Sequence, residues 1–168
     1  MLLTTERLEL TLQSPAEVLA WVDSLPPEVR SEISPNWLER LKNAIGPDPW
    51  SCMFRIRLIN AGLEIGSCGF KGAPDENGVV EIAYGIDEPY QNRGFATESA
   101  GALTAYAQSL DEVRLVRAST KSENVASERI LLKCGFTLIG QFNDPEDGLV
   151  NRWQTGTREI TTHLNVIL

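Results

Sequence analysis

Leucines alternate with polar residues near the start of the chain, the period-two pattern of a strand with one buried face. Leu8, Leu10 and Leu12 are each separated by one polar residue, which predicts a strand over residues 7–12. Six further runs rich in β-branched or aromatic residues predict strands over residues 50–59, 63–69, 79–86, 113–118, 136–142 and 149–155. Turns that end in glycine, at 60–62 and 77–78, connect the second, third and fourth strands, so we expect an antiparallel meander.

Four other segments carry helix signals. Residues 14–17 form a capping box with proline at the first helical position, and a Ser-Pro pair at 34–35 marks a second start. The predicted helices cover residues 14–23, 34–46, 95–110 and 122–134. Four apolar residues of the last helix are expected to face inward: Val125, Ile130, Leu131 and Leu132.

These elements follow the order β-αα-βββ-α-β-α-ββ, without an internal repeat or a linker. This order predicts an α/β (α+β) fold with a mixed, mostly antiparallel sheet of seven strands flanked by about four helices. The 168 residues suit one domain, residues 1–168, which is long enough to bury a core without disulfides or a structural metal.

Charge and composition narrow the classes of partner. The chain has 15 Lys and Arg against 23 Asp and Glu, a formal net charge of −8, which disfavours nucleic acid and anionic membranes as partners. Three cysteines of unrelated spacing and one histidine, His163, predict neither a disulfide framework nor a metal site. Since we find neither a signal peptide pattern nor a long apolar run, we expect a cytoplasmic protein.

The most informative segment joins the strand that ends at Ile86 to the helix that begins at Phe95. Its residues 91–96 read Gln-Asn-Arg-Gly-Phe-Ala. A helix start exposes unpaired N–H groups at the positive end of the helix dipole, and small residues there allow a phosphate to approach. By itself this string also fits an ordinary strand-to-helix connection.

The segment resembles the pyrophosphate loop of the GNAT superfamily of N-acetyltransferases, which reads Gln/Arg-x-x-Gly-x-Gly/Ala. Asn124-x-x-Ser127, followed by residues 133–136, is similar to a second block of that family, and residues 5–10 are similar to the start of its RimJ/RimL-like branch. The resemblance therefore spans nearly the whole chain. It implies a GNAT-like sheet that splays between its fourth and fifth strands, and acetyl-CoA as cosubstrate.

The resemblance also implies which residues hold the cosubstrate. Backbone groups near Tyr84 and Ile86 would pair with the pantetheine arm in the splayed gap, and Asn124 would bind its amides. The implied cofactor-binding residues are Ile86, Gln91, Asn92, Arg93, Gly94, Phe95, Ala96, Thr97, Asn124 and Ser127. No metal is implied.

Direct transfer to an amine needs one proton removed from the ammonium and one delivered to the departing sulfur. Glu81 stands near a position where several relatives carry a catalytic glutamate, and it could equally be a solvated strand-end carboxylate. Ser127 falls at the family's serine and could serve as the acid or merely as a helix residue. Many relatives place a tyrosine acid four residues later, where this chain has Leu131, so Ser127, Tyr84 or water would serve, or the thiolate would leave unassisted.

Other polar residues carry weaker signals. Arg129 and Lys133 could meet adenosine phosphates or stay solvated, and Cys134 is expected to be an inert thiol. Carboxylates at the strand ends, in the loop 143–148 and at Glu81, Asp87 and Glu88, favour a cationic acceptor.

Three functions remain open from the sequence. The first is an acetyl-CoA-dependent N-acetyltransferase that acts on a small-molecule amine or a peptide N-terminus. The second is a catalytically silent acyl-CoA-binding or regulatory domain, and the third is a structural module without a ligand. The sequence leaves both a monomer and a homodimer possible.

Overall fold

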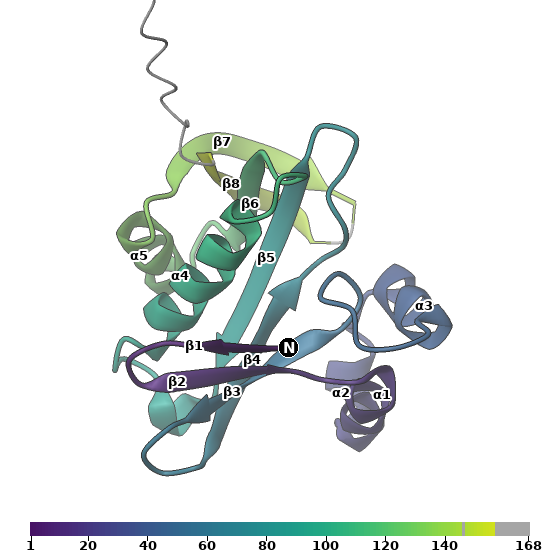
Figure 1. Ribbon diagram of the computed structural model, residues 1–168. Helices are drawn as coiled ribbons and strands as arrows, with labels where there is room; N and C mark the ends of the chain where they lie inside the picture. The colour runs from purple at the N-terminus through teal and green to yellow at the C-terminus, as the bar shows by residue number, and fades with distance from the viewer. Residues whose placement is uncertain (146, 157–168) are drawn as a thin grey trace, which may run out of the picture.

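A single sheet of eight strands forms the frame of the protein in the computed structural model, which describes residues 1–145 and 147–156 (Figure 1). The strands are β1 (Leu2–Thr4), β2 (Leu8–Leu12), β3 (Met53–Leu58), β4 (Glu64–Phe70), β5 (Val79–Ile86), β6 (Leu115–Lys121), β7 (Thr137–Asp144) and β8 (Gly148–Gly156). Their order across the sheet is β1-β2-β3-β4-β5-β6-β8-β7. Neighbouring strands are antiparallel except β5 and β6, which are parallel.

The seven expected strands and the antiparallel meander β3-β4-β5 are confirmed. The prediction of seven strands is one short, because β1 was missed. This strand is only three residues long and lacks alternation, and it forms by pairing with β2, with Leu3 opposite Leu10. A strand of this kind depends on its neighbour, so its own residues carry little signal.

The four expected helices are also present, with two additional short ones. The helices are α1 (Pro15–Ser24), α2 (Pro27–Arg30), α3 (Pro35–Asn43), α4 (Phe95–Gln108) and α5 (Val125–Lys133), and a 3₁₀ helix η1 covers Glu88–Tyr90. The capping box at Ser14 and Glu17 forms as predicted. Both missed helices are short, with four residues in α2 and three in η1, and each contains a proline.

The helices divide into two groups around the sheet (Figure 1). Helices α4 and α5 lie on one side, where Leu103 of α4 and Val80 and Ile82 of β5 are buried in the core. Helices α1, α2 and α3 gather near the ends of β2 and β3.

The expectation that Val125 and Leu132 face inward is wrong, because they are 50% and 59% exposed. Leu131 is fully buried and Ile130 is half-buried and packs against the core. A short helix that covers a sheet buries one stripe of residues spaced three or four apart. In α5 that stripe contains Ser127 and Leu131, so Val125 and Leu132 fall outside it.

Candidate active site

The sheet opens between its two parallel strands. Strand β6 pairs with β5 only at Val79, Val80 and Glu81, and then continues along β8. The rest of β5, from Ile82 to Ile86, pairs with β4 on its other edge. The strands therefore diverge toward their carboxyl ends, as expected for the splayed sheet, and ligand crevices in sheets with parallel strands form at this end.

The backbone of β5 faces this gap at every second residue. Glu81 O accepts a hydrogen bond from Lys71 N, and Asp87 N donates to Ile65 O, so the odd-numbered residues point toward β4. By the alternation of an antiparallel pair, Ile82, Tyr84 and Ile86 point their N–H and C=O groups into the gap. The carbonyl of Ile86 accepts a bond from Gln91 Nε2 at 2.8 Å.

The loop after β5 ends in an uncapped helix start. Asn92 and Gly94 adopt positive φ angles of 60° and 83°, and Gly94 is the N-cap of α4 with no side-chain hydrogen bond to the helix. Its carbonyl accepts the first helical bond, from Glu98 N. The N–H groups of Phe95, Ala96 and Thr97 therefore form the exposed donor end of a helix of 14 residues, a geometry that suits phosphate oxygens.

Helix α5 begins on the other side of the gap. Asn124 is its N-cap, and its Oδ1 accepts a bond from Ser127 N at 3.1 Å. Ser127 Oγ lies 2.8 Å from the hydroxyl of Tyr84 on β5, so a pair of hydroxyl groups bridges β5 and α5. Burial raises the pKa of Tyr84 to about 12 despite the hydrogen bond with Ser127, which opposes the shift. Tyr84 therefore remains protonated throughout the neutral range.

Leu131, at the position where the resemblance places a tyrosine, is fully buried in the core. The hydroxyl of Tyr84 instead comes from the opposite side of the gap, from β5.

The other face of β5 carries a carboxylate held by a lysine. Glu81 Oε1 lies 3.2 Å from Lys71 Nζ, which also donates a 2.7 Å bond to Asp147 Oδ2 in the β7–β8 turn. Burial alone would lower the pKa of Lys71, but the bonds and charges of Asp147 and Glu81 outweigh it and raise this pKa above its usual value. Lys71 is thus a fixed cation between two carboxylates.

A groove runs along this face of β4 and β5, in two adjoining parts of about 540 Å³ and about 270 Å³. Both parts share Ser67 and Gly85, and the larger part also includes Gly69 and Ala83, so small residues form much of the lining contributed by the strands. Half-buried indoles of Trp21 and Trp37 line the wall. Charged residues of the groove are Glu32, Arg40, Lys71, Asp147, Arg55, Glu64 and Asp87.

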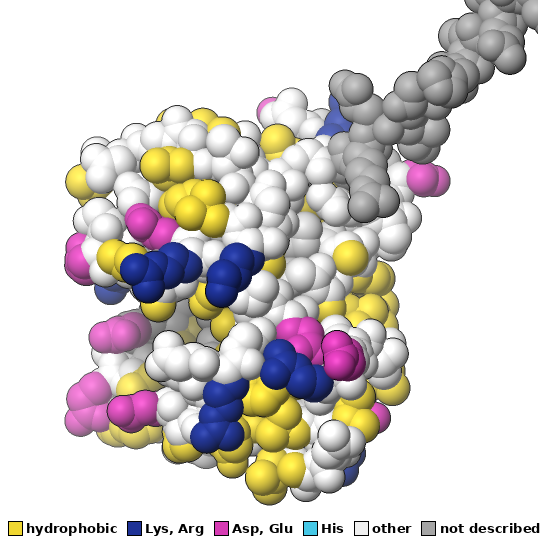
Figure 2. All heavy atoms as spheres, turned by 90° about the vertical axis from the view of Figure 1, so that its left-hand side faces the viewer, with side chains coloured by type: hydrophobic (Ala, Val, Ile, Leu, Met, Phe, Trp, Pro, Cys, Tyr) yellow, Lys and Arg dark blue, Asp and Glu magenta, His cyan; other side chains and the backbone are white. Residues whose placement is uncertain are grey.

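The space-filling view shows a deep recess on the side of the molecule where α5 and the β1–β2 turn lie (Figure 2). Lys and Arg side chains stand along its rim, and acidic side chains lie nearby. The net negative charge of the chain is therefore not spread evenly, and anions can approach this recess past basic groups.

Comparison with known proteins explains this combination of a splayed sheet and a helix start. Residues 4–137 match the family described as acetyltransferase (GNAT) domain. The chain belongs to the GNAT acetyltransferases. The matched range contains both β5 and the loop before α4, and also Asn124 and Ser127.

Relatives agree with this assignment. The GNAT chain is 35% identical over 74 residues to the uncharacterized N-acetyltransferase YjdG of Bacillus subtilis (strain 168), an alignment that covers 44% of each protein. It spans about half the length of the curated relatives it matches.

Two solved structures share the fold. RimL, the ribosomal L7/L12 alpha-N-protein acetyltransferase in complex with coenzyme A, is 20% identical with a TM-score of 0.68, and the alignment covers 93% of this chain and 98% of RimL. The ribosomal-protein-S5-alanine acetyltransferase of Vibrio fischeri is 12% identical with a TM-score of 0.70, over 95% and 98% of the two chains. The expected GNAT-like fold is therefore confirmed.

The remaining predicted site residues of the GNAT chain occupy different places. Arg93 is exposed, with its guanidinium 6.0 Å from the ring of Tyr90. Arg129 and Lys133 are exposed on α5. Cys134 Sγ donates to Thr97 O at 3.4 Å, and burial raises the pKa of this thiol, as expected for an inert cysteine.

The acidic residues expected near the acceptor are only partly where the sequence placed them. Asp87 lines the groove and Asp147 reaches it, but Lys71 pairs with both Asp147 and Glu81. Glu88 is exposed in η1, and Glu146 and His163 lie outside the described residues. Lys71 is the main residue that sequence reasoning missed, because its role depends on two carboxylates 10 and 76 positions away.

The described part of the chain shows neither a metal-binding cluster nor a membrane-spanning helix. Within residues 1–145 and 147–156, no group of three or more His, Cys, Asp or Glu residues is arranged to hold a metal ion. None of the described helices has the length and apolar character needed to cross a bilayer.

Proposed function

We propose that the protein is an acetyl-CoA-dependent N-acetyltransferase that transfers the acetyl group directly to a primary amine. The observation that carries this proposal is the divergence of β5 and β6 beside the uncapped start of α4. One end of the gap offers backbone donors for phosphate, and its wall offers strand backbone for an amide-containing arm. The chain's membership of the GNAT family supports this reading.

The residues of the gap fit acetyl-CoA in three places. The N–H groups of Phe95, Ala96 and Thr97 would bind the pyrophosphate, and the inward backbone groups of Tyr84 and Ile86 would pair with the pantetheine arm. Asn124 uses its carbonyl oxygen to cap α5, so its amide nitrogen is the group left to donate to a pantetheine carbonyl. Acetyl-CoA supplies an activated thioester that the acceptor amine attacks directly.

Proton transfer falls to groups on the two faces of β5. Glu81 lies at the end of the groove, beside Lys71, which lines it and holds the Glu81 carboxylate. This carboxylate would accept the proton of the acceptor ammonium. The Tyr84–Ser127 pair lies in the gap and would donate a proton to the departing sulfur. The backbone N–H groups of this part of β5 would stabilise the oxyanion.

Replacing Glu81 tests the base. Glu81→Gln should lower kcat about tenfold to a hundredfold, since positioned bases typically contribute at least that much, while KM for acetyl-CoA stays within twofold. Initial rates at saturating acetyl-CoA measure this. Glu9→Gln is the matched control, because Glu9 is also a strand glutamate in an ion pair, here with Arg57 Nη1 at 3.6 Å, but lies on β2, two strands from β4, and lines neither part of the groove. Equal rates for Glu81→Gln and wild type would exclude Glu81 as the base.

The acceptor groove supports an amine carried on an extended chain. The segment from Gly66 of β4 to Lys71, the residue after this strand, follows the groove. It spans about 17 Å at 3.3 Å per residue, which is long enough for several residues of an extended peptide. The solved relatives RimL and the S5-alanine enzyme are named for ribosomal-protein substrates. A peptide N-terminus is therefore the acceptor we favour, and a small amine is the alternative.

The first experiment is a melting curve with and without acetyl-CoA, followed by a screen for released CoA. At about a hundredfold excess over the dissociation constant, a ligand stabilises the folded state by about 2.7 kcal/mol, which raises Tm by roughly 5–10 °C for a domain of this size. A shift together with CoA release on short peptides establishes the transferase. A shift without release on any peptide or amine favours the silent acyl-CoA-binding domain, and no shift at millimolar acetyl-CoA contradicts both.

A further inference from the structure

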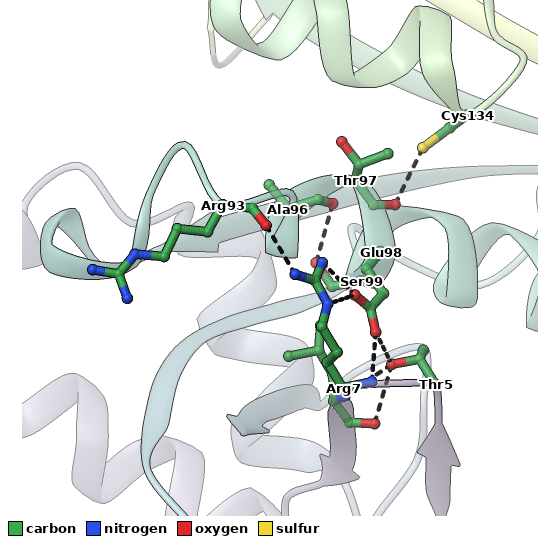
Figure 3. A network of polar contacts seen from close by, with 9 residues as sticks. Thr5, Arg7, Arg93, Ala96, Thr97, Glu98, Ser99 and Cys134 are labelled. Atoms are coloured by element: carbon green, nitrogen blue, oxygen red, sulfur yellow. Dashed lines mark hydrogen bonds and ion pairs between the residues drawn. The ribbon is translucent and has the colours of Figure 1, made fainter. Parts of the chain in front are cut away.

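The turn between β1 and β2 is bound to the first turn of α4, where the phosphate-binding loop ends (Figure 3). Glu98 Oε1 accepts hydrogen bonds from Thr5 Oγ1 at 2.5 Å and from Arg7 N at 2.9 Å. Glu98 Oε2 lies 2.7 Å from both Nε and Nη2 of Arg7. A single carboxylate thus receives four donor contacts from residues more than 90 positions away in the chain.

Arg7 also reaches past Glu98 to the loop itself. Its Nη1 donates to the carbonyl of Arg93 at 3.0 Å, and its guanidinium stacks 4.6 Å from the ring centre of Phe95. A Cβ atom added at Gly94 would lie 3.3 Å from Arg7 Nη2. Arg7 therefore contacts Arg93 in the loop and Phe95 at the start of α4, and its guanidinium borders the space beside Gly94 between them.

Glu98 places a negative charge at the helix start, and the contact with Arg7 balances this charge. A carboxylate in the first helical turn is favourable for the helix dipole, but it stands beside the N–H groups that would receive a doubly charged pyrophosphate. Burial would raise the pKa of Glu98, yet the bonds from Thr5 and Arg7 and the charge of Arg7 outweigh it and hold this pKa below its ordinary value. Glu98 is thus ionised, and Arg7 supplies the compensating cation at 2.7 Å.

We propose that Arg7 and Glu98 are positioning residues for cofactor binding, a clamp through which the β1–β2 turn fixes the phosphate-binding loop and neutralises the carboxylate at its helix start. The proposal rests on the proposed acetyl-CoA site. Neither residue needs to touch the reacting atoms. Glu98 binds Thr5 and Arg7 and so holds the β1–β2 turn against α4. Arg7, held in this way, contacts the Arg93 carbonyl and the Phe95 ring.

Arg7→Met tests the clamp, because it keeps most of the side-chain length but removes the guanidinium. The dissociation constant of acetyl-CoA, measured by calorimetry, should rise about tenfold, and KM for acetyl-CoA should rise with it. The kcat at saturating acetyl-CoA should stay within twofold, since the reacting groups on β5 and α5 are untouched. Arg57→Met is the matched control, because Arg57 is likewise exposed and paired with a glutamate but lies on β3. The Arg57→Met protein should bind acetyl-CoA with the affinity of wild type.

A second variant separates charge compensation from a general loss of structure. In the Arg7→Met background, Glu98→Gln removes the unbalanced charge and should restore acetyl-CoA affinity at least threefold. A merely structural role predicts no restoration, because the double variant has lost more contacts than the single one; that result would overturn the proposed neutralisation.

The binding measurements distinguish an error in the proposed clamp from an error in the proposed function. If wild type binds acetyl-CoA and Arg7→Met binds it equally well, the clamp is wrong and the cofactor site stands. A parallel fall of kcat and affinity in Arg7→Met also overturns it, since the defect then extends beyond the loop. Absence of binding by wild type overturns the proposed function and the clamp together.

Discussion

Gly94→Val should raise KM for acetyl-CoA about a hundredfold. Gly94 has a φ of 83°, where a β-branched residue is strained by about 1–2 kcal/mol, and its added side chain would press on Arg7 and stand beside the N–H groups of the helix start. A hundredfold change corresponds to about 2.7 kcal/mol, which strain and the blocked approach of phosphate together can supply. Steady-state kinetics with varied acetyl-CoA measure the change.

Gly101→Ala is the control for this replacement. Gly101 lies inside α4, where an added Cβ meets no atom within 4 Å, so alanine should raise Tm slightly through its better helix propensity and leave KM unchanged. If Gly94→Val retains a KM within threefold of wild type, the loop before α4 is not the phosphate site, and acetyl-CoA must bind elsewhere.

Tyr84→Phe should lower kcat about a hundredfold with little change in KM for acetyl-CoA. The hydroxyl of Tyr84 lies 2.8 Å from Ser127 Oγ inside the gap, and an acid that protonates a leaving group typically contributes about a hundredfold or more. Phenylalanine keeps the ring that packs against the core and removes only the hydroxyl. Single-turnover rates of CoA release measure the effect on the chemical step.

The raised pKa of Tyr84 predicts how kcat depends on pH. The acid must be protonated to act, and the pKa of Tyr84 is raised from its ordinary 10 to about 12, so wild-type kcat should not fall between pH 8 and 10 through loss of this proton. Ser127→Ala should resemble Tyr84→Phe if the two hydroxyls act as a pair. A Tyr84→Phe enzyme with unchanged kcat would show that the thiolate leaves without an acid from this residue.

Those helices that begin with strong local signals were predictable from the sequence. Ser14 and Ser34 each cap a helix through their own hydroxyl group, an interaction that depends on residues three positions away. The strand β1 was not predictable, because it forms by pairing with β2. The four-residue helix α2 was missed because it buries no residue and so shows no apolar pattern. The exposure of Val125 and Leu132 was missed because the sequence of α5 indicates a helix but does not indicate which side of that helix packs against the sheet.

The candidate site also has parts that the sequence predicted and parts that it did not. The loop at Gly94 is a local feature and was located from the sequence. Asn124 was singled out only as a pantetheine-binding residue, and its place as the N-cap of α5 was missed because the helix was expected to begin at residue 122. The Glu81–Lys71–Asp147 chain and the contact between Arg7 and Glu98 join residues far apart along the chain, and no spacing rule indicates them. Apart from the alternating leucines, residues 5–10 were noticed for their resemblance to relatives, whereas the structure shows what Thr5 and Arg7 do: both bind Glu98.

The gap beside β5 and the groove on its face are lined by different parts of the strand, contributed by alternate residues. The gap is lined by backbone groups of Ile82, Tyr84 and Ile86, which remain the same whichever residue is present, while the groove is lined by side chains such as Ala83, which change with every substitution. Under the proposed function, mutations on the groove side therefore alter which amine is accepted without disturbing acetyl-CoA binding. A strand of this kind can diversify in acceptor choice over evolution while its choice of acetyl donor stays constant.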